Sequence, residues 1–196
     1  MPVMYLDTHT PPLVTVGVGN LIDPIEAALE LPFQWKNATP PRPATPSEIA
    51  AEWTHIKSLS SLSNHASSIW NTVTQLFLDD QAIDNLIYSR LDEDEAILLK
   101  RWPYMTFATW PADAQLGVFS MGWAMGPSFQ FPLFEQACIK QDFSTAATQS
   151  HMADAHNPGL TPRNKANYQL FMNAAQVLKN TSGNLSPETL YYPRIL

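Results

Sequence analysis

The sequence predicts an α+β protein that is mostly α, with a small N-terminal β-hairpin lobe and a larger helical lobe. Apolar and polar residues alternate on both sides of a turn within residues 4–20, which is the period of β-strands. A proline-rich stretch interrupts the chain at 36–46, and beyond it apolar residues recur at helical spacing. We expect a single domain over 1–196, with the hairpin lobe at about 1–40, the helical lobe at 45–180 and an irregular tail at 181–196.

The first predicted element is a hairpin. In MYLDTHTPPLVTVGVGN, residues 4–20, two alternating segments flank Thr-His-Thr-Pro-Pro, and the second continues into Gly17 and Gly19. A dinucleotide-binding loop would need a third glycine where Ile22 stands, and a helical crossover in place of a hairpin. We therefore expect these glycines to bend the strand or to let another backbone approach closely.

Helix-start patterns follow the hairpin. Residues 24–35 predict a short amphipathic helix or turn, and the prolines of 36–46 oppose both strand and helix, which makes that stretch the expected lobe boundary. Thr45 is expected to cap a helix that begins at the following proline, with Glu48 completing a capping box. The serine-rich residues 58–75 indicate a loop that leads into a short helix or strand.

Three further stretches predict the rest of the helical lobe. The apolar positions of 79–100 indicate two helices hinged near the acidic run LDEDE. Residues 131–152 predict one or two helices. A last helix is expected to begin with Thr161 as its cap and Pro162 in its first turn, and to run to about residue 179.

The most apolar stretch predicts a central helix. Residues 110–126 carry almost no charge after Asp113 and place apolar side chains on all faces. Such a helix is expected to be buried on every side. Cys138, which lies in a later apolar stretch, is expected to be a core residue.

Composition excludes several classes of partner. A net charge of −7 and a charged content of only 15% oppose nucleic acid or an anionic membrane as the main partner. No run of apolar residues is long enough to span a bilayer, and no secretory signal pattern is present. We expect a monomer without a cofactor, and the cellular location stays open.

Asp7 is the residue that we expect to carry chemistry. An aspartate near a hairpin turn commonly has no function. Thr15 on the partner strand, however, offers a hydroxyl that could hold a water beside the carboxylate of Asp7. A carboxylate with a held water is the arrangement that a general base needs.

Two other kinds of site are not expected. His151, Asp154 and His156 lie close together in the sequence, but their spacing is not that of well-attested zinc sites, so we expect no metal and a solvated helix end. A serine nucleophile would need a Gly-x-Ser-x-Gly turn, which the sequence lacks.

The hairpin also carries a family resemblance. MYLDT and VTVGVGN resemble the hairpin of the phage-type lysozymes of glycoside hydrolase family 24, and of related muramidase domains in bacterial toxins and secreted effectors. WPADAQLGVFSMGWAMGPSF resembles the family's buried central helix, FEQACIKQDFSTAA its next helix, and TPRNKAN its arginine-bearing segment. The resemblance covers residues 4 to about 35 and 110–178. It implies a lysozyme-like fold and cleavage of the β-1,4 bond between N-acetylmuramic acid and N-acetylglucosamine in peptidoglycan, in the periplasm or cell wall.

The resemblance also implies roles for single residues. Asp7 would position and activate water, and Thr15 would help to hold that water. Arg163 would lie close to the catalytic pair, and Asn20 stands where many phage enzymes have a histidine, so both are expected to bind substrate. A toxin of this kind would also have a cognate inhibitor as a partner.

Two features depart from the family pattern. The family's general acid is a glutamate nine residues before the aspartate, a position that falls before Met1 in this chain. The turn, Thr-His-Thr-Pro-Pro with His9 in it, is two residues longer than usual and lacks the customary glycine. Hydrolysis needs a proton donor for the leaving sugar, so the chain as written is expected to hydrolyse peptidoglycan weakly.

Three interpretations follow from the missing glutamate. The chain is a muramidase shortened at its start, a non-catalytic lysozyme-like module that binds glycan or serves as structure, or a protein-interaction domain that reuses the fold. His9 is a conceivable substitute donor at the hairpin tip.

Overall fold

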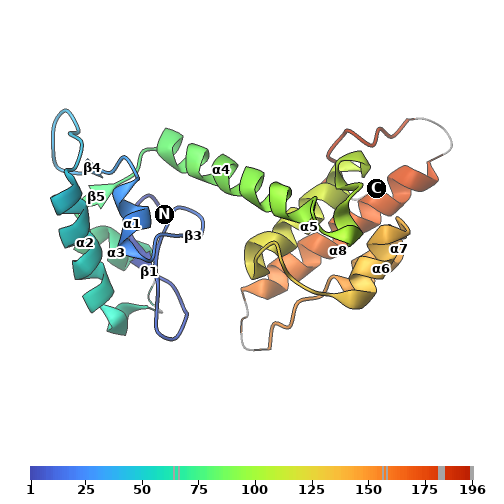
Figure 1. Cartoon of the computed structure of the whole chain (residues 1–196), viewed down its shortest axis with the longest axis horizontal. Helices are drawn as coiled ribbons and strands as arrows, with labels where there is room; N and C mark the ends of the chain where they lie inside the picture. Colours follow the sequence, from blue (N-terminus) through green and yellow to red (C-terminus); the bar gives the residue numbers. More distant parts are fainter. Residues whose placement is uncertain (64, 66, 156, 158, 181–183, 195–196) are drawn as a thin grey trace. The chain divides into compact units, whose positions relative to one another are not determined.

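The computed structural model describes residues 1–196 except 64, 66, 156, 158, 181–183 and 195–196. Its fold is α+β and mostly helical, as the sequence predicts. The chain forms two compact units, Met1–Arg90 and Leu91–Leu196 (Figure 1). Each unit has its own cluster of buried apolar residues. The units divide within a helix, and the proline-rich residues 36–46 lie inside the first unit.

A small antiparallel sheet opens the first unit. Strands β1 (Tyr5–Leu6) and β2 (Val14–Val16) form the predicted hairpin, and β3 (Asn20–Leu21) pairs with the other edge of β2. Gly17 and Gly19 have φ angles of +66° and +104° and make the tight turn from β2 to β3. These are left-handed conformations that glycine adopts without strain. The predicted bend is therefore present, while the third strand is too short to show an alternating pattern.

Helices and a second small sheet complete the first unit. In chain order the elements are α1 (Ile25–Leu29), β4 (Gln34–Trp35), α2 (Pro46–Ser58), the 3₁₀ helix η1 (Ser60–Leu62), α3 (Ser67–Val73) and β5 (Leu76–Phe77), with β4 antiparallel to β5. The capping box of α2 is confirmed. Thr45 Oγ1 accepts the N–H of Glu48, and the Glu48 carboxylate accepts the N–H of Thr45. Of the short helix or strand predicted after the serine-rich loop, the structure has a helix, α3.

The core of the first unit joins the sheet to these helices. The N–H of Trp35 donates to Arg42 O, so the proline-rich loop folds back along β4. Apolar side chains from the sheet, from α1 to α3 and from β5 meet in one buried cluster. Its members are Val3, Met4, Leu6, Val14, Val16, Ile22, Ala28, Phe33, Ile49, Ile56, Trp70, Leu76 and Leu78. Burial of both hairpin strands in this cluster fixes the turn that carries Asp7.

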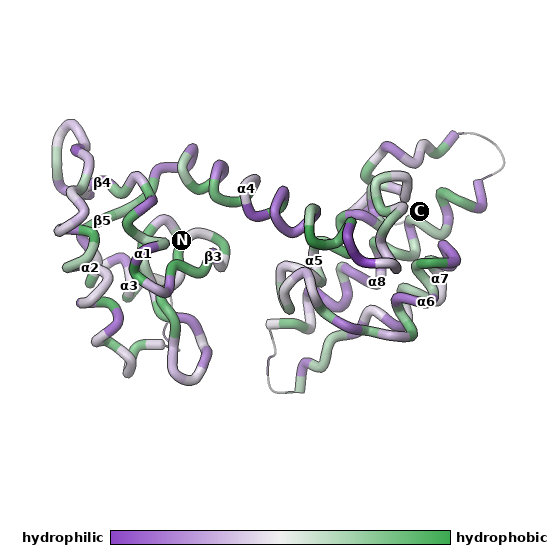
Figure 2. Tube along the Cα trace, in the orientation of Figure 1, coloured by the Kyte–Doolittle hydropathy of each residue, from purple (hydrophilic) through white to green (hydrophobic). Residues whose placement is uncertain are grey.

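Helix α4 (Asp80–Leu98) is continuous, so the prediction of two helices hinged near LDEDE is wrong. The acidic run, residues 91–95, contains no glycine or proline, and leucine and glutamate are good helix formers. Nothing in the run therefore interrupts the helix. Figure 2 shows hydrophilic and hydrophobic residues alternating along α4.

The second unit is helical. Its elements are the 3₁₀ helices η2 (Trp102–Tyr104) and η3 (Phe107–Thr109), followed by α5 (Ala112–Met125), α6 (Pro132–Ile139), α7 (Phe143–Gln149) and α8 (Leu160–Lys179). The stretch 131–152 thus forms two helices. The predicted end of α8 is confirmed, but its predicted cap is wrong. Gly159 occupies the N-cap position, and the hydroxyl of Thr161 donates to Asp154 Oδ2 instead.

Helix α5 has the predicted bounds but is not buried on every side. Leu116 is 38% exposed and Ala124 is exposed, while Phe119 and Trp123 are partly buried. The opposite side of α5 packs into the core of the second unit. That core consists of Leu98, Tyr104, Phe107, Trp110, Ala114, Val118, Met121, Phe129, Phe134, Ala137, Cys138, Phe143, Ala146, Ala147, Phe171, Ala174 and Ala175. Cys138 is fully buried, which confirms its prediction as a core residue.

The described part of the tail, residues 184–194, has no helix or strand, as predicted, yet it is tied to the second unit. The buried carboxylate of Asp113 accepts the N–H groups of Tyr191 and Tyr192 and the side-chain amide of Asn173. The sequence pattern did not predict this attachment, because it joins residues far apart in the chain.

Candidate functional site

Asp7 lies in the turn between β1 and β2, and its carboxylate contacts three donors. Oδ1 accepts the N–H of His9 at 3.0 Å and the N–H of Leu13 at 2.8 Å. Oδ2 lies 2.7 Å from Nδ1 of His9. A carboxylate offers about four acceptor positions, so one position remains on Oδ2. The turn is thus folded around the carboxylate of Asp7.

Asp7 also lines a surface hollow of about 340 Å³ in the first unit. The lining is formed by Met1, Tyr5, Leu6, Asp7, Thr8, Ser63, His65 and Trp70. Burial raises the pKa of the Tyr5 phenol, and the negative charge of Asp7 raises it further. Tyr5 therefore stays protonated at neutral pH. Among the described residues of this lining, Asp7 is the one carboxylate.

Thr15 and Asn20 lie in the sheet next to the turn of Asp7 but have different surroundings. Thr15 pairs with Tyr5 in the register of β1 and β2, and its hydroxyl donates to Leu13 O at 3.3 Å. Both side chains are almost fully buried, each at 4% exposure. The side-chain Oδ1 of Asn20 has no hydrogen-bond partner among the described residues. Neither residue belongs to the lining of the hollow.

Arg163 belongs to the second unit. It lies in the first turns of α8, where Nη1 donates to the main-chain oxygen of Ser120 at 3.1 Å and lies 3.2 Å from its hydroxyl. The structure thus places Asp7 in the hairpin turn, Thr15 and Asn20 on strands β2 and β3, and Arg163 against α5.

The loop after α7 brings a histidine close to a carboxylate. His151 Nε2 lies 3.7 Å from Asp154 Oδ1. The pKa of Asp154 is lowered, chiefly because the Thr161 hydroxyl donates to its carboxylate. Both residues line a second hollow of about 340 Å³, together with Thr161, Asn164, Lys165 and Tyr168. His156 lies outside the described residues, and within the described ones no group of three potential ligands could hold a metal ion.

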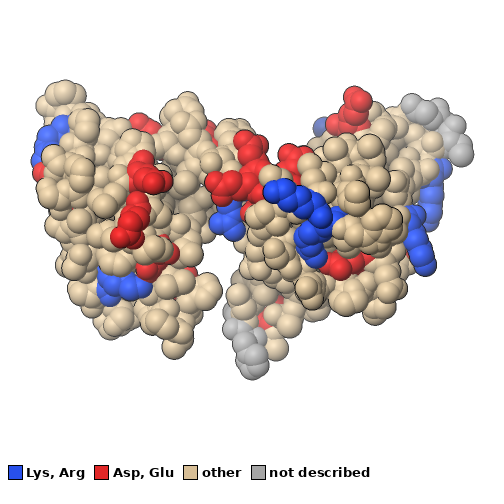
Figure 3. Space-filling model, in the orientation of Figure 1, with Lys and Arg blue, Asp and Glu red and all other residues tan. Residues whose placement is uncertain are grey.

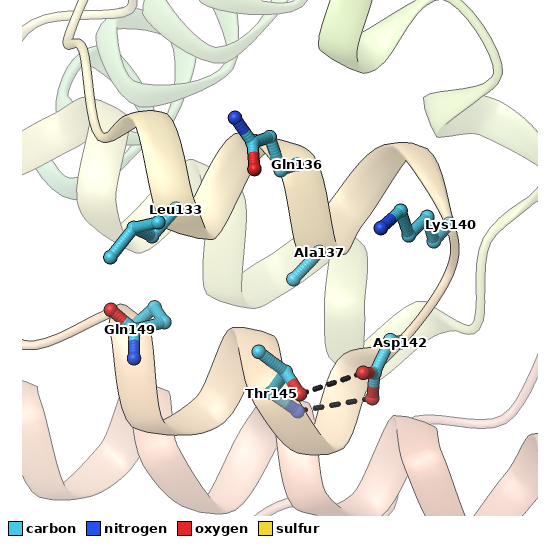
Figure 4. A pocket seen from close by; sticks show the side chains of 7 residues that line it. All are labelled: Leu133, Gln136, Ala137, Lys140, Asp142, Thr145 and Gln149. Carbon is cyan, nitrogen blue, oxygen red and sulfur yellow. Dashed lines mark hydrogen bonds between the residues drawn. The ribbon is translucent and has the colours of Figure 1, made fainter.

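A third hollow, of about 180 Å³, lies between α6 and α7 (Figure 4). Leu133, Gln136, Ala137 and Lys140 line it from the α6 side, and Asp142, Thr145 and Gln149 from the α7 side. The Asp142 carboxylate accepts the N–H and the hydroxyl of Thr145, as the dashed lines in Figure 4 show. These contacts cap α7 and account for Asp142 and Thr145 without a ligand.

The distribution of charged side chains over the surface agrees with the net charge of −7. On the face drawn in Figure 3, acidic side chains lie on both units, and Lys and Arg form only small separate groups. Among the helices that the structure describes, none is both long and apolar enough to cross a membrane.

Sequence reasoning proposed Asp7, which lines the hollow, and Thr15, which does not, and it missed His65 and Trp70, which line the hollow with Asp7. Both come from the segment between α2 and β5, which no pattern links to the hairpin. No protein-family model, curated protein or solved structure matches this chain.

Proposed function

We propose that this chain is a lysozyme-like module that acts on peptidoglycan, with Asp7 positioning the water that cleaves the bond between N-acetylmuramic acid and N-acetylglucosamine. The observation that supports the proposal is the setting of Asp7. Two main-chain N–H groups fix Oδ1, and the residue lines a hollow while Oδ2 keeps one acceptor position. A fixed carboxylate at a concave surface suits the activation of a water molecule.

In the proposed reaction, the water attacks the anomeric carbon while the glycosidic carbon–oxygen bond breaks. The water's proton passes to Oδ2 of Asp7, and the leaving oxygen takes a proton from solvent, because the described lining of the hollow holds no second carboxylate. The Thr15 hydroxyl donates to Leu13 O and is almost fully buried outside the lining of the hollow, so in the proposed reaction Asp7 alone holds the water. Asn20 is buried outside the lining of the hollow and Arg163 lies in the other unit, so the proposed site is built from the hollow of the first unit without them.

A second candidate function is glycan binding without cleavage. It is favoured by one observation, that the described lining of the hollow contains a single carboxylate. Glycoside hydrolysis ordinarily divides the work between two carboxylates. A hollow whose only carboxylate is the one that positions water would bind a glycan strand and hydrolyse it slowly.

Replacement of Asp7 by asparagine separates these possibilities. Release of soluble fragments from a purified cell-wall suspension is measured beside sedimentation of the protein with insoluble peptidoglycan. We expect the native chain to bind peptidoglycan and to release fragments slowly. Its rate of release should be roughly 10²- to 10⁴-fold lower than that of a lysozyme with both catalytic carboxyl groups. Asp7→Asn should bind equally and release nothing, whereas Glu30→Gln, an exposed charge change in the same unit, should match the native chain.

Each other outcome has a distinct meaning. Binding without fragment release by the native chain favours the glycan-binding function. Release that Asp7→Asn leaves unchanged contradicts the role of Asp7. Absence of both binding and release contradicts the proposed function. As a further arm, an N-terminal helix that presents a glutamate nine residues before Asp7 should raise the rate by at least about a hundredfold.

A further inference from the structure

His9 contacts both oxygens of the Asp7 carboxylate. Its main-chain N–H donates to Oδ1 at 3.0 Å, and its ring Nδ1 lies 2.7 Å from Oδ2. A carboxylate only accepts, so the proton between Nδ1 and Oδ2 is carried by the ring. The short distance is typical of a hydrogen bond strengthened by charge. With the Leu13 N–H on Oδ1 at 2.8 Å, the carboxylate is held at both ends.

His9 holds the carboxylate from outside the hollow. Asp7 belongs to the hollow's lining, and His9 does not. The His9 side chain is 71% exposed, against 19% for Asp7. Exposed pairs of this kind contribute little to folding stability. The contact therefore has more consequence for the orientation of the carboxylate than for the fold.

The ring contact adds to what the main chain already does for Asp7. The two main-chain donors both act on Oδ1 and set the mean orientation of the carboxylate, but they leave Oδ2 without a main-chain donor. The Nδ1 contact on Oδ2 narrows the remaining rocking of the carboxylate about its Cβ–Cγ bond. It also determines which acceptor position of Oδ2 stays open for a water.

We propose that His9 is a positioning residue for Asp7, which it orients through the Nδ1–Oδ2 hydrogen bond. The catalytic consequence rests on the proposed function, because it is the water held by Asp7 that would be misplaced without His9. The hydrogen bond itself can be tested without substrate.

Two variants of His9 distinguish a role in orienting Asp7 from a role that requires the imidazole ring itself. His9→Asn keeps an N–H donor at the position of Nδ1, because the side-chain nitrogen of asparagine is the same number of bonds from the backbone. His9→Ala removes that donor. Fragment release from peptidoglycan should fall at least about tenfold in kcat for His9→Ala with KM unchanged, and by less than about threefold for His9→Asn. His55→Ala, a change of an exposed histidine on α2, should match the native chain.

Hydrogen exchange at the Leu13 amide supplies the readout that needs no substrate, because this N–H donates to Asp7 Oδ1. In the full chain, exchange should be at least about tenfold faster in His9→Ala and unchanged in His9→Asn. If exchange follows this pattern and no variant releases fragments, the proposed function fails and the positioning of Asp7 by His9 stands. Equal exchange in His9→Ala and the native chain overturns the inference, whatever the activity. Loss of activity in His9→Asn as large as in His9→Ala also overturns it, because the ring itself would then be required.

Discussion

At the scale of single residues, three carboxylates each accept two main-chain N–H groups. Glu52 accepts the N–H groups of Gln75 and Leu76, Asp113 those of Tyr191 and Tyr192, and Asp7 those of His9 and Leu13. Each carboxylate thereby satisfies main-chain donors that strands and helices leave unpaired. Glu52 and Asp113 are buried, at 8% and 0% exposure, so their role is structural. Only accessibility to the hollow separates Asp7 from them, which is why the functional test concentrates on that residue.

Gly117 of α5 provides a prediction at the same scale. A Cβ atom added there would lie 2.6 Å from Cζ of Phe171, closer than packed atoms approach. Phe171 is fully buried and packs against Phe134, with ring centroids 5.1 Å apart, so its ring has no space to move into. We expect Gly117→Ala to lower the free energy of unfolding by roughly 1 to 3 kcal/mol, measured by urea denaturation.

Gly122 supplies the matched control for Gly117. It lies in the same helix, but a Cβ atom there would meet Pro127 at an ordinary 3.7 Å. Gly122→Ala should therefore be neutral or stabilise by up to about 1 kcal/mol, because alanine is the better helix former. Equal effects of the two substitutions would contradict the close packing of α5 against α8.

At the scale of elements, the sequence predicted those features that depend on neighbours in the chain. The hairpin, the capping box at Thr45 and the end of α8 each follow from residues within a few positions of one another. Two local patterns were misread, the hinge near LDEDE and the cap at Thr161, and other features escaped prediction because distant contacts decide them. The exposed edge of α5 at Leu116 depends on which helices pack against it, and β3 is defined only by its pairing with β2.

Helix α7 gives a prediction about pH at this scale. The hydroxyls of Thr145 and Ser144 and the N–H of Thr145 donate to Asp142, and they lower the pKa of its carboxyl from 3.8 to about 2. The carboxylate therefore contributes stability that is fully present above pH 3.8 and is lost as the pH falls through 2. The urea midpoint of the native chain should exceed that of Asp142→Asn near neutral pH, and the difference should shrink in acid.

The control for Asp142 is Glu188→Gln, which removes an exposed carboxylate in the same unit. Its midpoint should follow that of the native chain across the pH range. A difference between the native chain and Asp142→Asn that stays constant down to pH 2 would show that the Asp142 carboxylate does not act through its charge.

At the scale of the whole molecule, the chain consists of two units with separate cores. Sequence patterns do not reveal which distant segments meet within each unit, and this limited the prediction of the candidate site. The hairpin pattern was enough to single out Asp7, which lines the hollow, and Thr15, which proved to be buried outside it. His65 and Trp70 were not predictable, because the fold of the first unit alone brings them to Asp7. Arg163 entered only through a family resemblance, and it lies in the second unit.

The single cysteine makes the folding of the second unit measurable in the whole molecule. Cys138 is fully buried on α6, and burial, with a further contribution from the charge of Glu135, raises the pKa of its thiol well above the usual range. Because disulfide reagents react with the thiolate, we expect Cys138 to be labelled by such a reagent only when the second unit opens.

Phe134→Ala, which empties a fully buried position in the same core, should speed labelling of Cys138 by at least about a hundredfold. Leu133→Ala, on the same helix but at a side chain that is 63% exposed, should leave the rate unchanged. Labelling of the native chain as fast as that of the chain in concentrated guanidinium chloride would contradict the buried position of Cys138, and with it the helical core built around α5, α6 and α8.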